Sequence, residues 1–471
     1  MEIIPVALPD QLKPINIIRT RTYFILDKRL DETILRIALD ELIRTYWRKL
    51  GGRLRTRPKD KRLEYHLPET FEDHYVLFSW SSKEDEKSFW DIASFLDVPD
   101  WKGVTFLPPV DAIEDAFIPS TWPTSRKDEV PDAPLLYVHL TFATDATVIA
   151  TSLPHTVADQ YGLGNIMKAW LGLVEGKIPP PMVGQSDDVL PDSKPYTAFP
   201  KNVVFRKGRM RVRRRMEHFF VILGLIPDIV KYKEESAHIV FFPRPLVRSL
   251  QQRHQHVLRN KYGPGTTISE GDILTAIITK FSRMYDTKPR TIALSQSINL
   301  RGRHPDRALG ESDGFIHNSL HYATAHFRID ASTSVSEIAY RNRQAINQAL
   351  EEEDIDIGMS VTREMVRRGQ PIHICEPFER FYSISNWCGA WKGLDFRGAV
   401  AVRDPEREKR TLLDVDMLVV GQGNKPGAPR RFRTSIMSKT SEGFYCDFSA
   451  PPKAIELIRA YLEKDPLLER F

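Results

Sequence analysis

The chain has 471 residues, of which 41% are hydrophobic and 27% charged, and its formal net charge is +5. This composition is that of an ordinary globular protein and excludes a disordered chain. The charge is small for the length, so it does not by itself predict a polyanionic partner. No apolar run approaches the roughly twenty residues that a bilayer requires. Because residues 1–10 also lack the basic start of a secretory signal, we expect a cytoplasmic protein without integral membrane association.

The length and the cysteine content predict the number of domains and the state of the thiols. A chain of this size exceeds what one hydrophobic core usually organises, so two domains are expected. The three cysteines are Cys375, Cys388 and Cys446, without a C-x-x-C pair or a suitably placed histidine. We therefore expect free thiols and no metal site.

The first predicted elements are a helix and a later hairpin. Apolar residues recur at helical spacing from Leu35 to Leu50 and stop at Gly51 and Gly52, which indicates a helix packed on a sheet. Strand-like segments cover residues 135–143 and 146–153 around a short turn, which predicts a β-hairpin.

His155 and Asp159 follow that hairpin directly, and helical apolar spacing begins again at Leu163. A histidine at such a junction is a candidate proton acceptor, because the unperturbed imidazole pKa is about 6.5. The spacing alone is weak, since His326 and Asp330 repeat it within an alternating strand-like run that we interpret as structural. A histidine that merely satisfies a buried carboxylate is the alternative for the first pair.

The middle of the chain predicts a connection between domains. A proline-rich stretch from Pro179 to Pro200 precedes Lys201–Arg215, which holds eight basic residues and no acid. A solvated linker is the main interpretation of that basic run, with contact to the phosphates of a nucleotide-bearing substrate as the alternative. The apolar segment Phe219–Pro227 is too short to span a membrane, although a basic segment beside it could rest on an anionic surface.

The remaining elements predict a second mixed domain. A capping-box-like start at Ser269 opens a helix, and a strand over residues 291–300 ends at Arg301. Further strands are expected at residues 382–387, 412–420 and 443–448, and a closing helix at residues 454–462. We thus divide the chain into an N-terminal domain (1–190), a basic crossover linker (191–235) and a C-terminal domain (236–471).

Several of these stretches, taken in order, resemble the BAHD acyltransferases. The family's H-x-x-x-D-G motif is matched by His155 and Asp159, and its D-F-G-W-G motif in part by Asp395–Ala399. Two departures are Gln160 after the first aspartate and the loss of most of the second motif. Further matches are Trp47–Leu54, Gly162 with Gly164, Ile298–Arg301, Phe315–Ser319 and Ser385–Trp387.

The resemblance implies an α/β fold with two similar mixed-sheet domains of the chloramphenicol-acetyltransferase-like type and an active-site channel between them. It implies that His155 is the general base and that Asp159 orients the site by pairing with Arg301. Asp395 is a third catalytic-site candidate, although the family uses its motif mainly for structure. Oxyanion stabilisation is expected near Ser385, Asn386 and Trp387.

The resemblance also implies the substrates. Acyl-CoA, with acetyl-CoA preferred, is expected as a co-substrate and not as a permanently bound cofactor, with Thr267, Ser269 and Arg303 as phosphate-side contacts. The acceptor is expected to be a hydroxylated secondary metabolite such as a terpenoid, meroterpenoid or polyketide, and the enzyme a monomer that binds no nucleic acid. The alternatives are a non-catalytic binding or regulatory protein of this fold, and N-acyl transfer or condensation-type chemistry.

Overall fold

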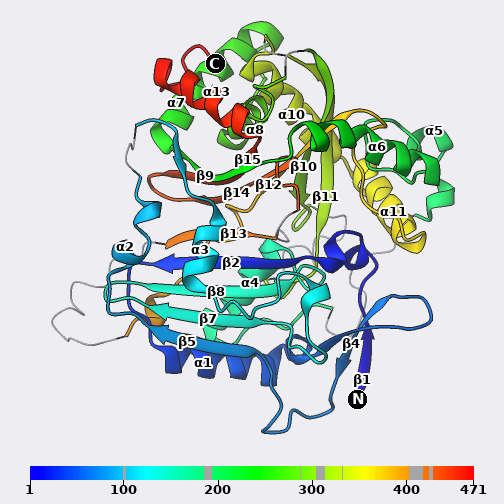
Figure 1. The fold of residues 1–471 in the computed structure, drawn as a ribbon. Helices are drawn as coiled ribbons and strands as arrows, with labels where there is room; N and C mark the ends of the chain where they lie inside the picture. The colour runs from blue at the N-terminus through cyan, green and yellow to red at the C-terminus, as the bar shows by residue number, and fades with distance from the viewer. Residues whose placement is uncertain are drawn as a thin grey trace.

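The computed structural model describes residues 1–98, 102–184, 194–286, 288–303, 313–330, 332–401, 417–423 and 428–471. Within these ranges the strands form two large sheets and one small sheet, and Figure 1 shows the two large sheets in neighbouring layers. The small sheet has the order β1-β4-β3, formed by Glu2–Pro5, Leu63–Leu67 and Arg53–Thr56.

The first large sheet holds the predicted hairpin. Its order is β13-β2-β8-β7-β5, formed by Met417–Gln422, Arg19–Leu26, Thr147–Pro154, Tyr137–Phe142 and Ser79–Glu84. β7 and β8 pair antiparallel, as the sequence predicts. Every residue of β2, β7 and β8 is buried, because both faces of this sheet are covered.

The second large sheet holds the predicted strands of the C-terminal part. Its order is β11-β10-β12-β14-β15-β9-β6, formed by Leu320–Ile329, Arg290–Asn299, Arg380–Asn386, Arg433–Lys439, Gly443–Ala450, Ser236–Pro243 and Thr105–Leu107. The predicted strands at 291–300, 382–387 and 443–448 are confirmed as β10, β12 and β15. Of the strand predicted at 412–420, residues 412–416 lie outside the described residues and the rest begins β13.

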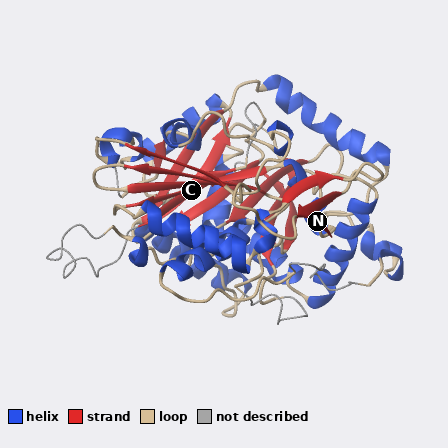
Figure 2. Cartoon of the chain, turned by 90° about the horizontal axis from the view of Figure 1, so that it is seen from below, coloured by secondary structure: helices blue, strands red, loops and turns tan. Residues whose placement is uncertain are grey.

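Helices cover the outer faces of the sheets, and Figure 2 shows the strands running through the middle of the molecule. The predicted first helix is α1, which continues into a π-helical turn at Leu42–Tyr46 before the chain reaches Gly51. The helix predicted from the apolar spacing after Leu163 is confirmed as α4, which begins earlier, at Gln160, and the helix predicted after Ser269 is confirmed as α8, which begins at Glu270. The described helices are α1 (Glu32–Glu41), α2 (Phe89–Ile92), α3 (Val110–Phe117), α4 (Gln160–Val174), α5 (Lys201–Val204), α6 (Arg215–Lys231), α7 (Arg244–Tyr262), α8 (Glu270–Phe281), α10 (Val335–Ala349), α11 (Glu352–Arg367) and α13 (Pro452–Lys464).

The two halves of the chain exchange strands. β13, from the C-terminal half, pairs with β2, whereas β6, from the N-terminal half, pairs with β9. A shared core joins the sheets, with Tyr23 and Val148 from one sheet and Phe241 and Tyr445 from the other. In the ranges given above, no helix is both long and apolar enough to cross a membrane. The exchanged strands and shared core hold the two sheets together around the site described next.

Candidate active site

His155 lies at the carboxyl end of β8, in the turn before α4. Its backbone N–H donates to the carbonyl of Ile18 (2.9 Å), and its carbonyl accepts from Nδ2 of Asn318 (2.8 Å). The ring is partly exposed, and its buried Nδ1 has no hydrogen-bond partner among the described residues. The backbone of His155 is therefore held on both sides, while its imidazole is left available for other contacts.

Asp159 is the N-cap of α4 and is almost fully buried. Its Oδ1 accepts from the N–H of Gly162 (2.8 Å) and lies 2.9 Å from Nη2 of Arg301. Its Oδ2 accepts from Nη1 of Arg301 (3.0 Å) and from the N–H of Ser319 (3.1 Å). Each oxygen thus has two partners, which fills the usual acceptor capacity of a carboxylate. This carboxylate is arranged to hold structure in place and has no free position for a proton in transit.

Glycine at position 162 is required by the packing of α4. A Cβ atom at Gly162 would lie 1.9 Å from the carbonyl oxygen of Ile316, a distance that no real side chain tolerates. The glycine lets the first turn of α4 approach the segment that supplies Asn318 and Ser319 to the site. The glycines after the H-x-x-x-D motif therefore serve close backbone contact.

His155 lines a cavity of about 340 Å³ between the two large sheets. One wall comes from β2, the segment after β8 and the start of α4, and the other from β10, β12 and β14. The lining residues used below are His155, Asp159, Tyr161, Tyr322, His373, Ile374, Cys375, Ser385, Asn386, Trp387 and Arg433. A cavity of this size, apolar over much of its surface and carrying a few polar groups, suits a small organic molecule.

Ser385, Asn386 and Trp387 lie at the end of β12 and line this cavity together with His155. Oδ1 of Asn386 accepts from the N–H of Cys388 (3.0 Å). A Cβ atom at Gly271, in the first turn of α8, would lie 3.4 Å from Nδ2 of Asn386. The amide nitrogen of Asn386 therefore faces the N-terminus of α8 and is a hydrogen-bond donor beside the cavity.

Thr267 and Ser269 lie at that N-terminus, and both are exposed. Ser269 is the N-cap of α8, and it forms the predicted capping box with Asp272. Nη2 of Arg343 also donates to Oγ of Ser269 (2.9 Å). The capping box occupies the N–H groups of Ser269 and Asp272, and Arg343 also pairs with Asp272. The positive end of the helix dipole and the exposed side chains of Thr267 and Ser269 are what this helix start offers to an anion. Arg303, the third predicted contact, is exposed in the turn after β10.

Asp395 lies outside the cavity lining. Its Oδ1 accepts from Nε of Arg397 (2.8 Å), and the neighbouring Phe396 packs against Phe24 in the core. A Cβ atom at Gly398 would lie 3.0 Å from the side chain of Glu175, at the end of α4. The structure thus brings His155, Asp159, Arg301 and Ser385–Trp387 together, whereas Asp395 belongs to a segment packed on the far end of α4.

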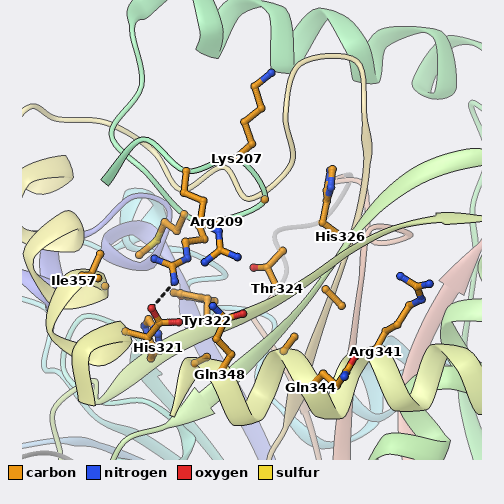
Figure 3. Close-up of a pocket in the computed structure, with 18 of the residues that line it drawn as sticks. Lys207, Arg209, His321, Tyr322, Thr324, His326, Arg341, Gln344, Gln348 and Ile357 are labelled. Carbon is orange, nitrogen blue, oxygen red and sulfur yellow. Dashed lines mark hydrogen bonds and ion pairs between the residues drawn. The ribbon is translucent and has the colours of Figure 1, made fainter. Parts of the chain in front are cut away.

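A second cavity, of about 450 Å³, is lined by the basic run, β11, α10 and α11. Figure 3 shows its cationic side chains, among them Lys207, Arg209 and Arg341. Arg209 forms an ion pair with Asp354, also in the lining. Tyr322 lines both cavities, and burial raises its pKa to about 12.

The expectation that the whole basic run is solvated is wrong. Arg211 and Arg213 are buried and both pair with Glu376, at 2.8 and 3.1 Å. Met210 and Val212 beside them are buried too, so this part of the run lies inside the protein. The Glu376 carboxylate compensates the cost of burying the two arginines. Residues 191–193 of the predicted linker lie outside the described residues.

Sequence reasoning missed Asp10, which holds Asn318 in place against His155. Asp10 is 1% exposed, and its Oδ1 accepts from both the N–H (3.1 Å) and Nδ2 (2.8 Å) of Asn318. Oγ1 of Thr156 donates to the carbonyl of Asp10 (2.6 Å). The resemblance singled out the segment of Asn318, but no local pattern marks Asp10.

Comparisons with known proteins agree with this architecture. No family model matches the chain. Acetyltransferase adrJ of Penicillium roqueforti is 26% identical over 388 residues, which are 79% of this chain and 77% of that protein. O-acyltransferase pboC of Aspergillus ustus is 25% identical over 62% of this chain and 63% of its own length. Transcriptional regulator calD of Penicillium decumbens is 26% identical over 87% of this chain and 84% of its own length.

Two solved structures share this fold over most of their chains. TRI101 of F. sporotrichioides, solved with coenzyme A and T-2, has a TM-score of 0.67 at 13% identity, with 97% of each chain covered. Vinorine synthase has a TM-score of 0.56 at 15% identity, with 97% of this chain and 92% of its own chain covered. The predicted fold class and the resemblance to the BAHD acyltransferases are confirmed.

Proposed function

We propose that this protein is an acyl-CoA-dependent O-acyltransferase that moves an acyl group, with acetyl preferred, to a hydroxyl of a secondary metabolite such as a terpenoid, meroterpenoid or polyketide. The observation that carries the proposal is the placement of His155 in the cavity between the sheets, with a fixed backbone and a partly exposed ring. The similar adrJ protein is named an acetyltransferase, which supports acetyl transfer, and pboC is named an O-acyltransferase, which supports transfer to oxygen. We expect a cytoplasmic monomer.

In the proposed reaction, His155 takes the proton from the acceptor hydroxyl as its oxygen attacks the thioester carbonyl. The carbon–sulfur bond then breaks, and the protonated imidazole returns that proton to the departing CoA thiolate. The products are an ester and free CoA, so protons and electrons balance without an oxidant. Nδ2 of Asn386 is the donor that we assign to the developing oxyanion.

The protonation state of the nearby thiols supports transfer of the acyl group straight from CoA to the acceptor, without an acyl-enzyme. Burial raises the pKa of Cys375, in the cavity lining, to about 11, and that of Cys388 to about 12. A thiol that stays protonated at neutral pH is a poor nucleophile. We therefore infer that no cysteine carries an acyl group during turnover.

Thr267, Ser269 and Arg303 are the proposed contacts for the phosphates of CoA. Thr267 and Ser269 lie at the positive end of α8, next to the amide of Asn386. A thioester anchored there would present its carbonyl to the cavity from the side of β12. Arg303 lies in the turn after β10 and is exposed.

The test is transfer by the purified chain in pools of alcohols and amines supplied with acetyl-CoA, malonyl-CoA and longer thioesters. Release of free thiol reports turnover, and mass spectrometry identifies the product. We expect an ester from at least one alcohol pool, and no ester with His155→Ala. His373→Ala is the matched control, since His373 lines the same cavity but burial lowers its pKa to about 4. The control should change KM for the acceptor more than kcat.

A regulatory role is the second candidate function, because the similar calD protein is named a transcriptional regulator. A non-catalytic protein would release no thiol with any pool, whereas products confined to the amine pools would indicate N-acyl transfer. Either outcome contradicts the proposed O-acyltransferase.

A further inference from the structure

α6 presents an unusually apolar outer surface. Only Val221, Gly224 and Asp228 of its seventeen residues are buried. The large apolar side chains exposed on this helix are Met216, Phe219, Phe220, Ile222, Leu223, Ile226, Ile229 and Val230. A helix on the surface of a soluble protein normally turns polar residues outward, and a contiguous apolar patch of this kind marks a contact surface. Figure 1 places α6 at the outer edge of the molecule, beyond β11.

Phe378 extends this apolar surface from another part of the chain. Its side chain is 62% exposed, and its ring centroid lies 5.9 Å from that of Phe220. Its φ is +65°, a left-handed conformation that costs a non-glycine residue about 1 kcal/mol or more. A Cβ atom at Gly224 would lie 2.7 Å from Cα of Phe378, so the helix and this turn fit closely. The fold thus holds an exposed aromatic ring in a strained turn beside the apolar helix.

Cations flank the apolar surface at both ends of α6. Arg214 and Arg215 lie at the N-terminal end of the helix, and Lys231 and Lys233 lie at its C-terminal end. All four side chains are exposed. The acids of the helix itself are already neutralised or hidden. Arg211 donates to Glu217 (2.6 Å) and lowers the pKa of that carboxyl to about 2.

The second acid of the helix, Asp228, is buried and pairs with Arg380 at 3.2 Å. Beyond the helix, Glu235 pairs with Arg431 (3.2 Å), and Glu234 is the exposed acid next to Lys233. The outer surface of α6 therefore combines apolar side chains with a net positive rim. This is the pattern of a helix that lies in the interface of an anionic bilayer.

We propose that α6, together with Phe378, binds the surface of a membrane that contains anionic lipids. Seventeen residues span about 25 Å as an α-helix, and one face of this helix is fixed to the protein, so it lies along the interface and does not cross it. The apolar side chains enter the boundary of the acyl chains, and the flanking cations meet the headgroup phosphates or carboxylates.

α6 also touches the wall of the candidate active site. Val221, on its buried face, packs in one cluster with Ile374 and Cys375, both of which line the cavity of His155. If the proposed function holds, on which this step rests, an apolar acceptor dissolved in the bilayer would enter the cavity from this side. The membrane contact itself does not depend on turnover.

The experiment is flotation of the purified full chain with vesicles, without substrates. We compare phosphatidylcholine vesicles with vesicles of phosphatidylcholine and phosphatidylserine. The wild-type chain should float with the anionic vesicles and much less with the neutral ones. Phe219→Gln combined with Ile222→Gln should lower partitioning at least about tenfold. Arg215→Gln combined with Lys233→Gln should lower it about fivefold for each cation on anionic vesicles only.

Ile37→Gln on α1 is the matched control, because Ile37 is also a large exposed apolar residue but lies in the other half of the chain. It should leave partitioning unchanged. Absence of flotation with anionic vesicles would overturn the proposal, as would flotation that survives the Phe219 and Ile222 changes. Dimerisation in ultracentrifugation that these changes abolish, without vesicle binding, would assign the surface to a second copy and equally overturn it. Thiol release without vesicles tests the proposed function separately.

Discussion

The segments His155–Asp159 and Asp395–Ala399 each carry an aspartate that the same resemblance singled out, yet their carboxylates have different surroundings. The side chain of Asp159 is 4% exposed and pairs with Arg301, 142 residues away. The side chain of Asp395 is 33% exposed and pairs with Arg397, two residues away. The first carboxylate joins distant segments of the molecule, whereas the contacts of the second with described residues stay within its own turn. Burial and the origin of the partner, rather than presence in a motif, therefore set what each aspartate contributes.

The largest expected effect is that of His155→Ala, which tests whether the first segment carries the chemistry. Removal of a general base lowers turnover by about 10²- to 10⁴-fold. We expect this loss in kcat, measured by thiol release, with the free energy of unfolding within about 1 kcal/mol of wild type. A folded variant that retains the wild-type rate would contradict the assignment.

Asp159→Ala should mainly cost stability, because it leaves the Arg301 guanidinium buried without its carboxylate. Breaking a buried pair of this kind costs about 3 to 5 kcal/mol. Urea unfolding measures the loss. Asp159→Leu combined with Arg301→Met should recover much of it without recovering activity. A loss of activity at full stability would show instead that Asp159 acts in the chemistry.

Asp447 extends the comparison, since it is buried like Asp159 but its carboxyl group has no hydrogen-bond partner within the described chain. Burial raises the pKa of its carboxyl from 3.8 to about 6. Between these values the folded chain keeps a proton that the unfolded chain has lost, so stability falls as the pH rises through this window. Relative to wild type, Asp447→Asn should therefore gain about 2 to 3 kcal/mol between about pH 4 and about pH 7.

Urea unfolding at several pH values checks this prediction, with Asp395→Asn as the control. A difference between Asp447→Asn and wild type that does not change with pH would disprove the account given for Asp447.

The smallest expected effect is that of Asp395→Ala. An ion pair this exposed is worth less than about 1 kcal/mol, and the side chain lies outside the cavity lining. We expect a change of under about 1 kcal/mol in unfolding and a kcat within about threefold of wild type. A loss comparable to that of His155→Ala would remove the distinction between the two segments.

The local elements of the site could be predicted from the sequence. Alternation and turn residues mark β7 and β8, and the capping box marks the start of α8, because these signals depend on neighbouring residues only. The contacts by which Asp10 and Asn318 hold the backbone of His155 could not be predicted in this way. Asp10 and Asn318 are separated by 308 positions, and a single buried aspartate near the N-terminus leaves no periodic pattern. The burial of Arg211 and Arg213 in the basic run could not be predicted for the same reason, since their partner Glu376 lies far along the chain.

The exchange of β6 and β13 sets the order in which the site can be completed during synthesis. The strand that closes the N-terminal sheet beside β2 ends at Gln422, late in the chain. When His155 leaves the ribosome, the edge of β2 is therefore still unpaired, and the nascent N-terminal half must wait for most of the remaining chain. A fragment cut between the halves would carry an open sheet edge on each piece, so the two pieces should be insoluble apart and soluble when co-expressed.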